Sequence, residues 1–160
     1  MNKLASVSIC LLLWSGFAVA DPVLDEDIIE GIRAEFSLAM ENADVATFQK
    51  YLYPGSKIII DLDPSLSAGE TEIGYEDYMA MLEMGLQLMK DAEMDEELLS
   101  ISIDAENNQA TLREKTTATM IIMGMKFQDA TISETTFGVV GGEIKVLVAR
   151  EQLISSGPVQ

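Results

Sequence analysis

The sequence has 160 residues, of which 27 are acidic and 10 are basic, and its formal net charge is -17 at pH 7. So acidic a chain disfavours binding to nucleic acid phosphates or to an anionic membrane surface. It has no histidine and a single cysteine, Cys10, so we expect neither a cofactor nor a bound transition metal, and histidine-dependent catalysis is excluded.

The start of the chain has the pattern of a secretory signal peptide. Lys3 gives a short positive beginning, an apolar run over residues 4–17 follows, and Ala18-Val19-Ala20 forms a small-x-small exit. We predict cleavage after Ala20, a periplasmic or secreted protein, and a single domain over residues 21–160 with its core over about 24–153. After cleavage we expect no contact with a membrane, because no later segment resembles a spanning helix.

Helical periodicity predicts most of the first half of the chain. Apolar residues recur at intervals of four over Val23–Glu41, which favours a first helix. Asp44 is placed to cap a second, shorter helix that ends at Tyr53-Pro54-Gly55. Three further segments are expected in order: a strand over Lys57–Leu62, a polar loop over Asp63–Gly74, and a third helix from Tyr75 to about Ala92.

The second half of the chain predicts an antiparallel meander, because it is rich in Ile, Val, Thr and Phe. Four strands are expected, over Leu98–Asp104, Ala110–Ile122, Phe127–Val140 and Glu143–Leu153. The turn signals are Asn107-Asn108, Gly124 and Gly141-Gly142. If each turn is a two-residue loop, alternation of side chains gives the meander one consistently apolar face.

The opposite face of this sheet is predicted to be more apolar than contact with water requires. Its small and apolar residues are Thr117, Thr119, Ile121, Ala130, Ile132, Thr136, Val140 and Leu147. A patch of this kind usually meets a partner. We therefore expect a homodimer formed through the sheet.

The order helix, helix, strand, helix and four meandering strands resembles the nuclear transport factor 2-like superfamily, which includes SnoaL-like and ketosteroid-isomerase-like proteins. Two local features match it: Asn42-Ala43-Asp44-Val45 between the first helices, and Gly142-Glu143-Ile144-Lys145-Val146 at the start of the last strand. That last segment usually carries a tryptophan where this chain has Ile144. The resemblance implies an α+β fold in which a curved antiparallel sheet wraps the N-terminal helices into a cone with an internal pocket.

A group of polar residues falls within the apolar face. The predicted pairing places Glu114 opposite Ile101 and Thr135, Thr116 opposite Leu99 and Ser133, and Ser133 opposite Arg150. The expected pocket residues are therefore Glu114, Thr116, Ser133, Thr135 and Arg150, with Tyr75 and Met79 from the third helix. Two interpretations remain open: a closed Glu114–Arg150 ion pair, or the polar floor of an apolar ligand pocket.

Asp61 is the candidate catalytic residue that the resemblance implies. Ketosteroid isomerases carry an aspartate general base in the strand or loop after the second helix, where Asp61 and Asp63 stand. Their oxyanion donors, a tyrosine and a protonated aspartate, have only loose counterparts in Tyr51, Tyr75 and Asp129.

A cation loop is a further hypothesis for the same region. Asp61, Asp63, Ser65 and Glu72 have the spacing of calcium ligands in an EF-hand loop, but Leu66 stands where that loop requires glycine. A solvated acidic loop is the favoured interpretation, and no metal site is predicted.

We expect a non-catalytic binding or assembly module that holds a small apolar ligand. The alternative is a small-molecule isomerase or hydratase that uses Asp61 as its base.

Overall fold

The computed structural model describes residues 21–61, 69–89 and 92–159. The expected signal peptide, residues 1–20, lies outside the described residues. In the part of the chain that is described, no helix is long and apolar enough to cross a membrane.

Three helices form where the sequence predicts them. α1 (Glu26–Asn42) begins after Asp25, whose carboxylate accepts a hydrogen bond from the Ile28 backbone N–H at 2.9 Å. It starts three residues later than expected, because Asp25 serves as the cap and not as a helical residue. α2 (Val45–Tyr51) is capped by Asp44 as predicted, and α3 spans Tyr75–Met89.

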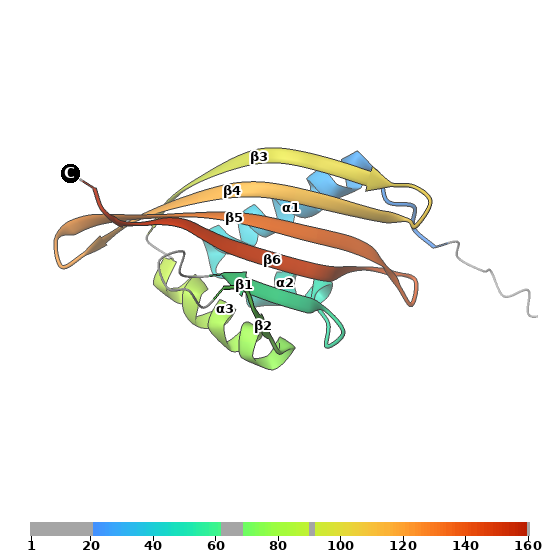
Figure 1. Cartoon of the computed structure of the whole chain (residues 1–160), viewed down its shortest axis with the longest axis horizontal. Helices are drawn as coiled ribbons and strands as arrows, with labels where there is room; N and C mark the ends of the chain where they lie inside the picture. The colour runs from blue at the N-terminus through green and yellow to red at the C-terminus, as the bar shows by residue number, and fades with distance from the viewer. Residues whose placement is uncertain (1–20, 62–68, 90–91, 160) are drawn as a thin grey trace, which may run out of the picture.

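The strands form one six-stranded sheet in the order β2-β1-β6-β5-β4-β3. They are β1 (Lys57–Asp61), β2 (Thr71–Ile73), β3 (Glu93–Asp104), β4 (Gln109–Ile122), β5 (Met125–Val140) and β6 (Glu143–Pro158). β1 pairs with β6 in parallel, and the other neighbours are antiparallel. Figure 1 shows the long strands curving past the helices, which confirms the α+β cone-type architecture. The short β2 falls inside the segment that was expected to be a polar loop.

All three helices pack on one face of the sheet, which we call the inner face. Ile29 and Ile32 of α1 and Tyr78 of α3 share a buried core with Ile58 of β1 and Phe137 of β5. The rings of the helical aromatic residues Phe36 and Phe48 stack with centroids 5.0 Å apart. The opposite side of the sheet is the outer face.

The hairpin loops set a register that differs from the predicted one. Met123-Gly124 forms a two-residue loop, so that Ile122 pairs with Met125 and Glu114 pairs with Ser133, not with Thr135. The loop between β3 and β4 has four residues, because Asp104 pairs with Gln109 and its carboxylate accepts the backbone N–H groups of the loop.

Together with a bulge in β3 between Leu98 and Ser100, these loops change the cross-strand neighbours of Glu114 and Thr116 relative to the sequence prediction. Glu114 faces Leu98 and not Ile101. Thr116 lies between Glu96 and Thr131, and not between Leu99 and Ser133.

A β-bulge in β6 overturns the predicted faces of its second half. Phe137 pairs with Val146 and Thr136 pairs with Val148, which leaves Leu147 as the extra residue. Gly138 makes room for it, since a Cβ there would lie 2.6 Å from Leu147 Cδ1. One extra residue reverses side-chain alternation beyond it. Residues 148–153 therefore exchange faces relative to the prediction, until a second bulge at Ile154 reverses the alternation again.

Candidate functional site

Three polar residues lie side by side across the inner face of the sheet. Glu114 on β4 pairs with Ser133 on β5, which pairs with Glu151 on β6. We call these three residues the polar strip; Thr116 and Thr135 flank it on the same face. At the usual spacing of strands, the Cα atoms of Glu114 and Glu151 are about 10 Å apart.

The strip sits among core residues because of side-chain alternation. Glu114 follows the buried Leu112 by two positions, and Glu151 follows the buried Ala149 by two. The sheet thus brings two carboxyl groups beneath the helices.

α1 holds the Glu114 end of the strip through an ion pair. The Arg33 Nε donates to Glu114 Oε1 at 2.5 Å, and the two side chains are 27% and 16% exposed. One helical turn later, the Ser37 hydroxyl donates to the carboxylate of Glu96 on β3. Burial raises the pKa of Glu114; the Arg33 guanidinium opposes this shift, and the nearby Glu96 carboxylate adds to it.

α3 holds the Glu151 end through a neutral donor. The Tyr78 hydroxyl donates to Glu151 Oε1 at 2.5 Å. Burial raises the pKa of Glu151, although the hydrogen bond from Tyr78 opposes that shift. The pKa of the buried Tyr78 is raised well above its usual value, by burial and by the charge of Glu151. This end can therefore keep a proton more readily than an exposed glutamate does.

The strip has the chemistry to orient a polar group within an apolar environment. A protonated carboxyl donates a hydrogen bond and an ionised one accepts, while Ser133 can do both. Among the described residues, no group of three His, Cys, Asp or Glu side chains is placed to hold a metal ion. In the hypothetical cation loop, Asp63 and Ser65 lie outside the described residues, and Glu72 pairs with Lys57 at 3.5 Å.

Arg150 does not lie beside Glu114, and the predicted pair between them is wrong. The bulge at Leu147 turns Arg150 to the outer face, where it lies 3.4 Å from Glu70 and 4.0 Å from Glu134. Glu151 takes the inner position in its place.

The other predicted pocket residues are dispersed over the helix-facing side. Thr116, Ser133 and Thr135 share the inner face with Glu114. Met79 of α3 is buried in the core, and Tyr75 is partly buried against it.

Asp61, the candidate base, lies away from the polar strip. It ends β1 opposite Gln152, on the same outer face as Ile59 and Arg150. The Tyr51 hydroxyl, one loose counterpart of an oxyanion donor, instead donates to Glu35 at 2.8 Å.

Sequence reasoning missed Arg33, Tyr78 and Glu151, because the predicted pairing placed Arg150 in the inner position that Glu151 occupies. Arg33 follows the buried Ile32, and Tyr78 lies one turn after Tyr75 within an apolar helix. For Arg33 and Tyr78, the only signal in the sequence was that each of these two side chains carries a polar group within an otherwise apolar stretch of its helix.

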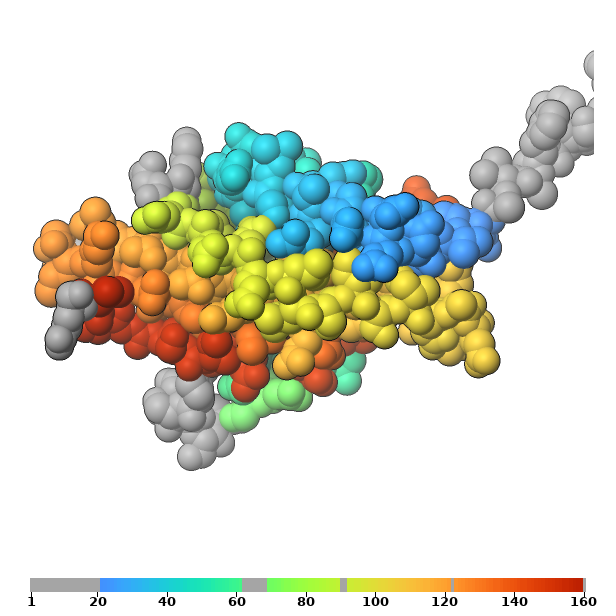
Figure 2. Space-filling view, turned by 90° about the horizontal axis from the view of Figure 1, so that it is seen from above, coloured from blue at the N-terminus to red at the C-terminus, as the bar shows by residue number. Residues whose placement is uncertain are grey.

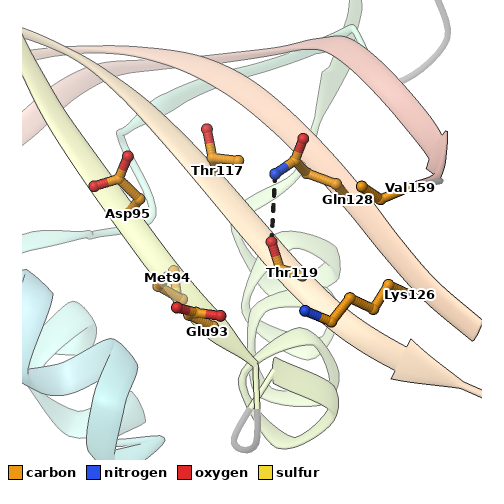
Figure 3. A pocket seen from close by; sticks show the side chains of 8 residues that line it. All are labelled: Glu93, Met94, Asp95, Thr117, Thr119, Lys126, Gln128 and Val159. Atoms are coloured by element: carbon orange, nitrogen blue, oxygen red, sulfur yellow. Dashed lines mark hydrogen bonds between the residues drawn. The ribbon is translucent and has the colours of Figure 1, made fainter.

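The outer face carries a hollow of about 500 Å³ at the end of the sheet near the β4–β5 hairpin. Figure 3 shows its lining residues: Glu93, Met94, Asp95, Thr117, Thr119, Lys126, Gln128 and Val159. The Gln128 amide lies 3.4 Å from the Thr119 hydroxyl, and Lys126 points across the hollow towards β3. The lining mixes polar and apolar side chains and carries both signs of charge.

No protein-family model matches the sequence, and no curated protein matches it. Solved structures do match the fold. A conserved protein from Planctomyces limnophilus is 16% identical, with a TM-score of 0.64 over 84% of this chain and 98% of that chain.

Two further solved structures share the fold. An NTF2-like protein from Cytophaga hutchinsonii is 14% identical, with a TM-score of 0.57 over 82% of this chain and 100% of that chain. A hexachlorocyclohexane dehydrochlorinase (LinA) of type 2 is 9% identical, with a TM-score of 0.59 over 82% of this chain and 86% of that chain.

Proposed function

Since the chain has the fold of the nuclear transport factor 2-like proteins, we propose that it is a non-catalytic module that binds a small, largely apolar ligand. The ligand lies between the helices and the inner face of the sheet. Glu114, Ser133 and Glu151 orient its polar group, while core residues contact the rest.

The observation that carries this proposal is the polar strip itself. Small-molecule sites are mostly apolar and contain a few convergent polar groups. Glu114 and Glu151 lie in one row, and burial raises the pKa of both carboxyls. Carboxyl groups with perturbed pKa values within a core mark candidate binding sites.

Catalysis by an isomerase or hydratase is the second candidate, and the Tyr78–Glu151 pair favours it. A phenol beside a carboxyl of raised pKa resembles the oxyanion donors of ketosteroid isomerase. One protein of similar fold is a dehydrochlorinase. The position of Asp61 on the outer face weighs against it as the base for a substrate at the strip.

We further propose that the mature protein begins at Asp21, is periplasmic or secreted, and forms a homodimer through its outer face. Ile121 on that face is 72% exposed, which supports a contact there. Light scattering should give twice the monomer mass at micromolar concentration. An Ile121→Lys variant should shift the protein towards the monomer, and a monomeric wild-type protein would contradict the dimer.

Native mass spectrometry of the purified protein tests the binding role. We expect the wild type to carry a small molecule, and an isosteric Glu151→Gln variant to lose most of it. Glu143→Gln is the matched control, because Glu143 is exposed and pairs with Lys145 at 2.7 Å. A folded wild type without bound molecule, or equal loading in the Glu151→Gln variant, contradicts the proposal.

A further inference from the structure

β3 forms one edge of the sheet, and in the described part of the chain it pairs only with β4. Figure 2 is a view onto this edge of the sheet, and it shows β3, in yellow, open to solvent beside α1, in blue. Its register with β4 is unbroken from Glu93 to Leu98, before a bulge between Leu98 and Ser100. The second set of backbone N–H and C=O groups in such an edge is a template for another extended segment.

The side chains of this edge indicate which segment would fit. Glu93, Asp95 and Glu97 alternate along β3, so all three carboxylates lie on the outer face. The β4 neighbours of Glu93 and Asp95 are the neutral Thr119 and Thr117. Opposite charges on directly facing strand positions stabilise pairing. A strand arriving at this edge would therefore gain from cations beside Glu93 and Asp95, whereas Glu97 already faces Lys115 of β4.

A second copy of this chain fits the edge poorly. Two β3 strands side by side would place carboxylates against carboxylates, and like charges at facing positions destabilise pairing. At the opposite edge of the described sheet, β2 is only three residues long and carries Glu72. The pattern selects a basic segment from a different protein.

We propose that the β3 edge binds an extended, basic segment of another protein by strand addition. The segment pairs with the backbone of Glu93–Leu98 and places lysine or arginine side chains beside Glu93 and Asp95. The hollow lined by Glu93 and Asp95 adjoins these positions on the outer face, and Lys126 lies on its other side. This site is separate from the polar strip and does not depend on the ligand proposed there.

Fluorescence anisotropy with a labelled synthetic peptide of alternating lysine and threonine tests the proposal at low salt. Two comparison peptides have the same charge: one has its lysines in a single block, and one has N-methylated central backbone amides that cannot pair. The protein variants are Glu93→Gln/Asp95→Asn at the edge and Glu26→Gln/Glu30→Gln on the exposed side of α1. Matching thermal melts establish that each variant is folded.

The alternating peptide should bind the wild type about tenfold or more tightly than either comparison peptide, since only it can form both backbone and charge pairs. The edge variant should lose about tenfold in affinity, and the α1 variant should lose little. Equal binding of the blocked or N-methylated peptide would overturn strand addition, because it would mean charge attraction alone. Equal losses in the edge and α1 variants would overturn the placement at β3.

Discussion

Glu114 and Glu151 lie in the same row of the sheet, and burial raises the pKa of both carboxyl groups. The helices above them supply different partners: α1 brings the guanidinium of Arg33, whereas α3 brings the neutral hydroxyl of Tyr78. A cation stabilises the ionised carboxylate far more than a neutral donor does. The α1 contact is thus an ion pair, and the α3 contact can work with a protonated carboxyl.

This comparison teaches that one row of a sheet can offer two kinds of polar anchor. The difference comes from the helix and not from the strand. Changes to Arg33 or Tyr78 should therefore have effects of different size and different pH dependence.

Removing the Arg33 guanidinium should have the largest effect on the free energy of unfolding. Arg33→Met strands the Glu114 carboxylate, and we expect a loss of about 2–4 kcal/mol, because breaking a buried pair is costly and this pair is only partly buried. Urea denaturation at neutral pH measures the loss. The double variant Arg33→Met/Glu114→Gln should recover much of it, since no unpaired charge remains.

The control for this experiment is an exposed ion pair. Lys57 lies 3.5 Å from Glu72, and both side chains are more than half exposed. Lys57→Met should therefore change the free energy of unfolding by less than about 1 kcal/mol. Similar losses for Arg33→Met and Lys57→Met would contradict the ion-pair account of the α1 contact.

Removing the Tyr78 hydroxyl, a neutral donor, should have a smaller effect on the free energy of unfolding. Tyr78→Phe takes one hydrogen bond from the partly buried Glu151, and we expect a loss of about 1–3 kcal/mol in the free energy of unfolding. The pKa of Glu151 should rise further, because Tyr78 now lowers it. The loss of stability should consequently be smaller at pH 5 than at pH 7.5. A loss that does not depend on pH would show that the Tyr78 hydroxyl does not lower the pKa of Glu151.

Stability should depend on pH through the same two groups. A glutamate in the unfolded chain has a pKa of about 4.3. In the folded protein, the pKa values of Glu114 and Glu151 are higher. Between the two values the folded state binds more protons, so the free energy of unfolding falls as pH rises through the folded pKa values.

Thermal melts from about pH 4.5 to pH 8 measure this dependence, because glutamates with raised pKa values titrate in that range. Lowering the pH also relieves charge repulsion in so acidic a chain, and this too stabilises the folded protein. Glu151→Gln separates the two causes: it should flatten the curve, whereas the exposed Glu143→Gln should leave its shape unchanged. A curve as steep in Glu151→Gln as in the wild type would remove Glu151 from the explanation.

The smallest expected effect concerns the bulge that turns Glu151 inwards. In Gly138→Ala the new Cβ must displace the flexible end of Leu147, 2.6 Å away, so we expect a loss of about 1 kcal/mol. Urea denaturation measures it. A neutral result would mean that Leu147 moves freely and that the bulge does not depend on Gly138.

Local signals predicted the elements well, because each depends on neighbouring residues. Asp44 capped α2 as its side chain predicts, and the glycine turns joined β4 to β5 and β5 to β6 at two-residue loops. The start of β3 was placed at Leu98 instead of Glu93, because its acidic first residues have low strand propensity.

The candidate site was harder to predict because it depends on register. Leu147 looks like any strand residue, and its bulge is visible in the sequence only indirectly, through Gly138 on the neighbouring strand. That one extra residue exchanges Arg150 for Glu151 on the inner face. The contacts of Arg33 and Tyr78 depend on how the helices cross the sheet, which local periodicity does not encode.

The titration of the Glu114 and Glu151 side-chain carboxyl carbons, followed by carbon-13 NMR, tests the central claim most directly. Glu114→Gln and Glu151→Gln assign the two signals. We predict that both midpoints lie above the ordinary glutamate value of about 4.3, and that the Glu151 midpoint rises further in Tyr78→Phe. Midpoints at the ordinary value would show that the two carboxyls are solvated, and midpoints below it would show that their partners outweigh burial. Either result would contradict the raised pKa values of an interior polar strip.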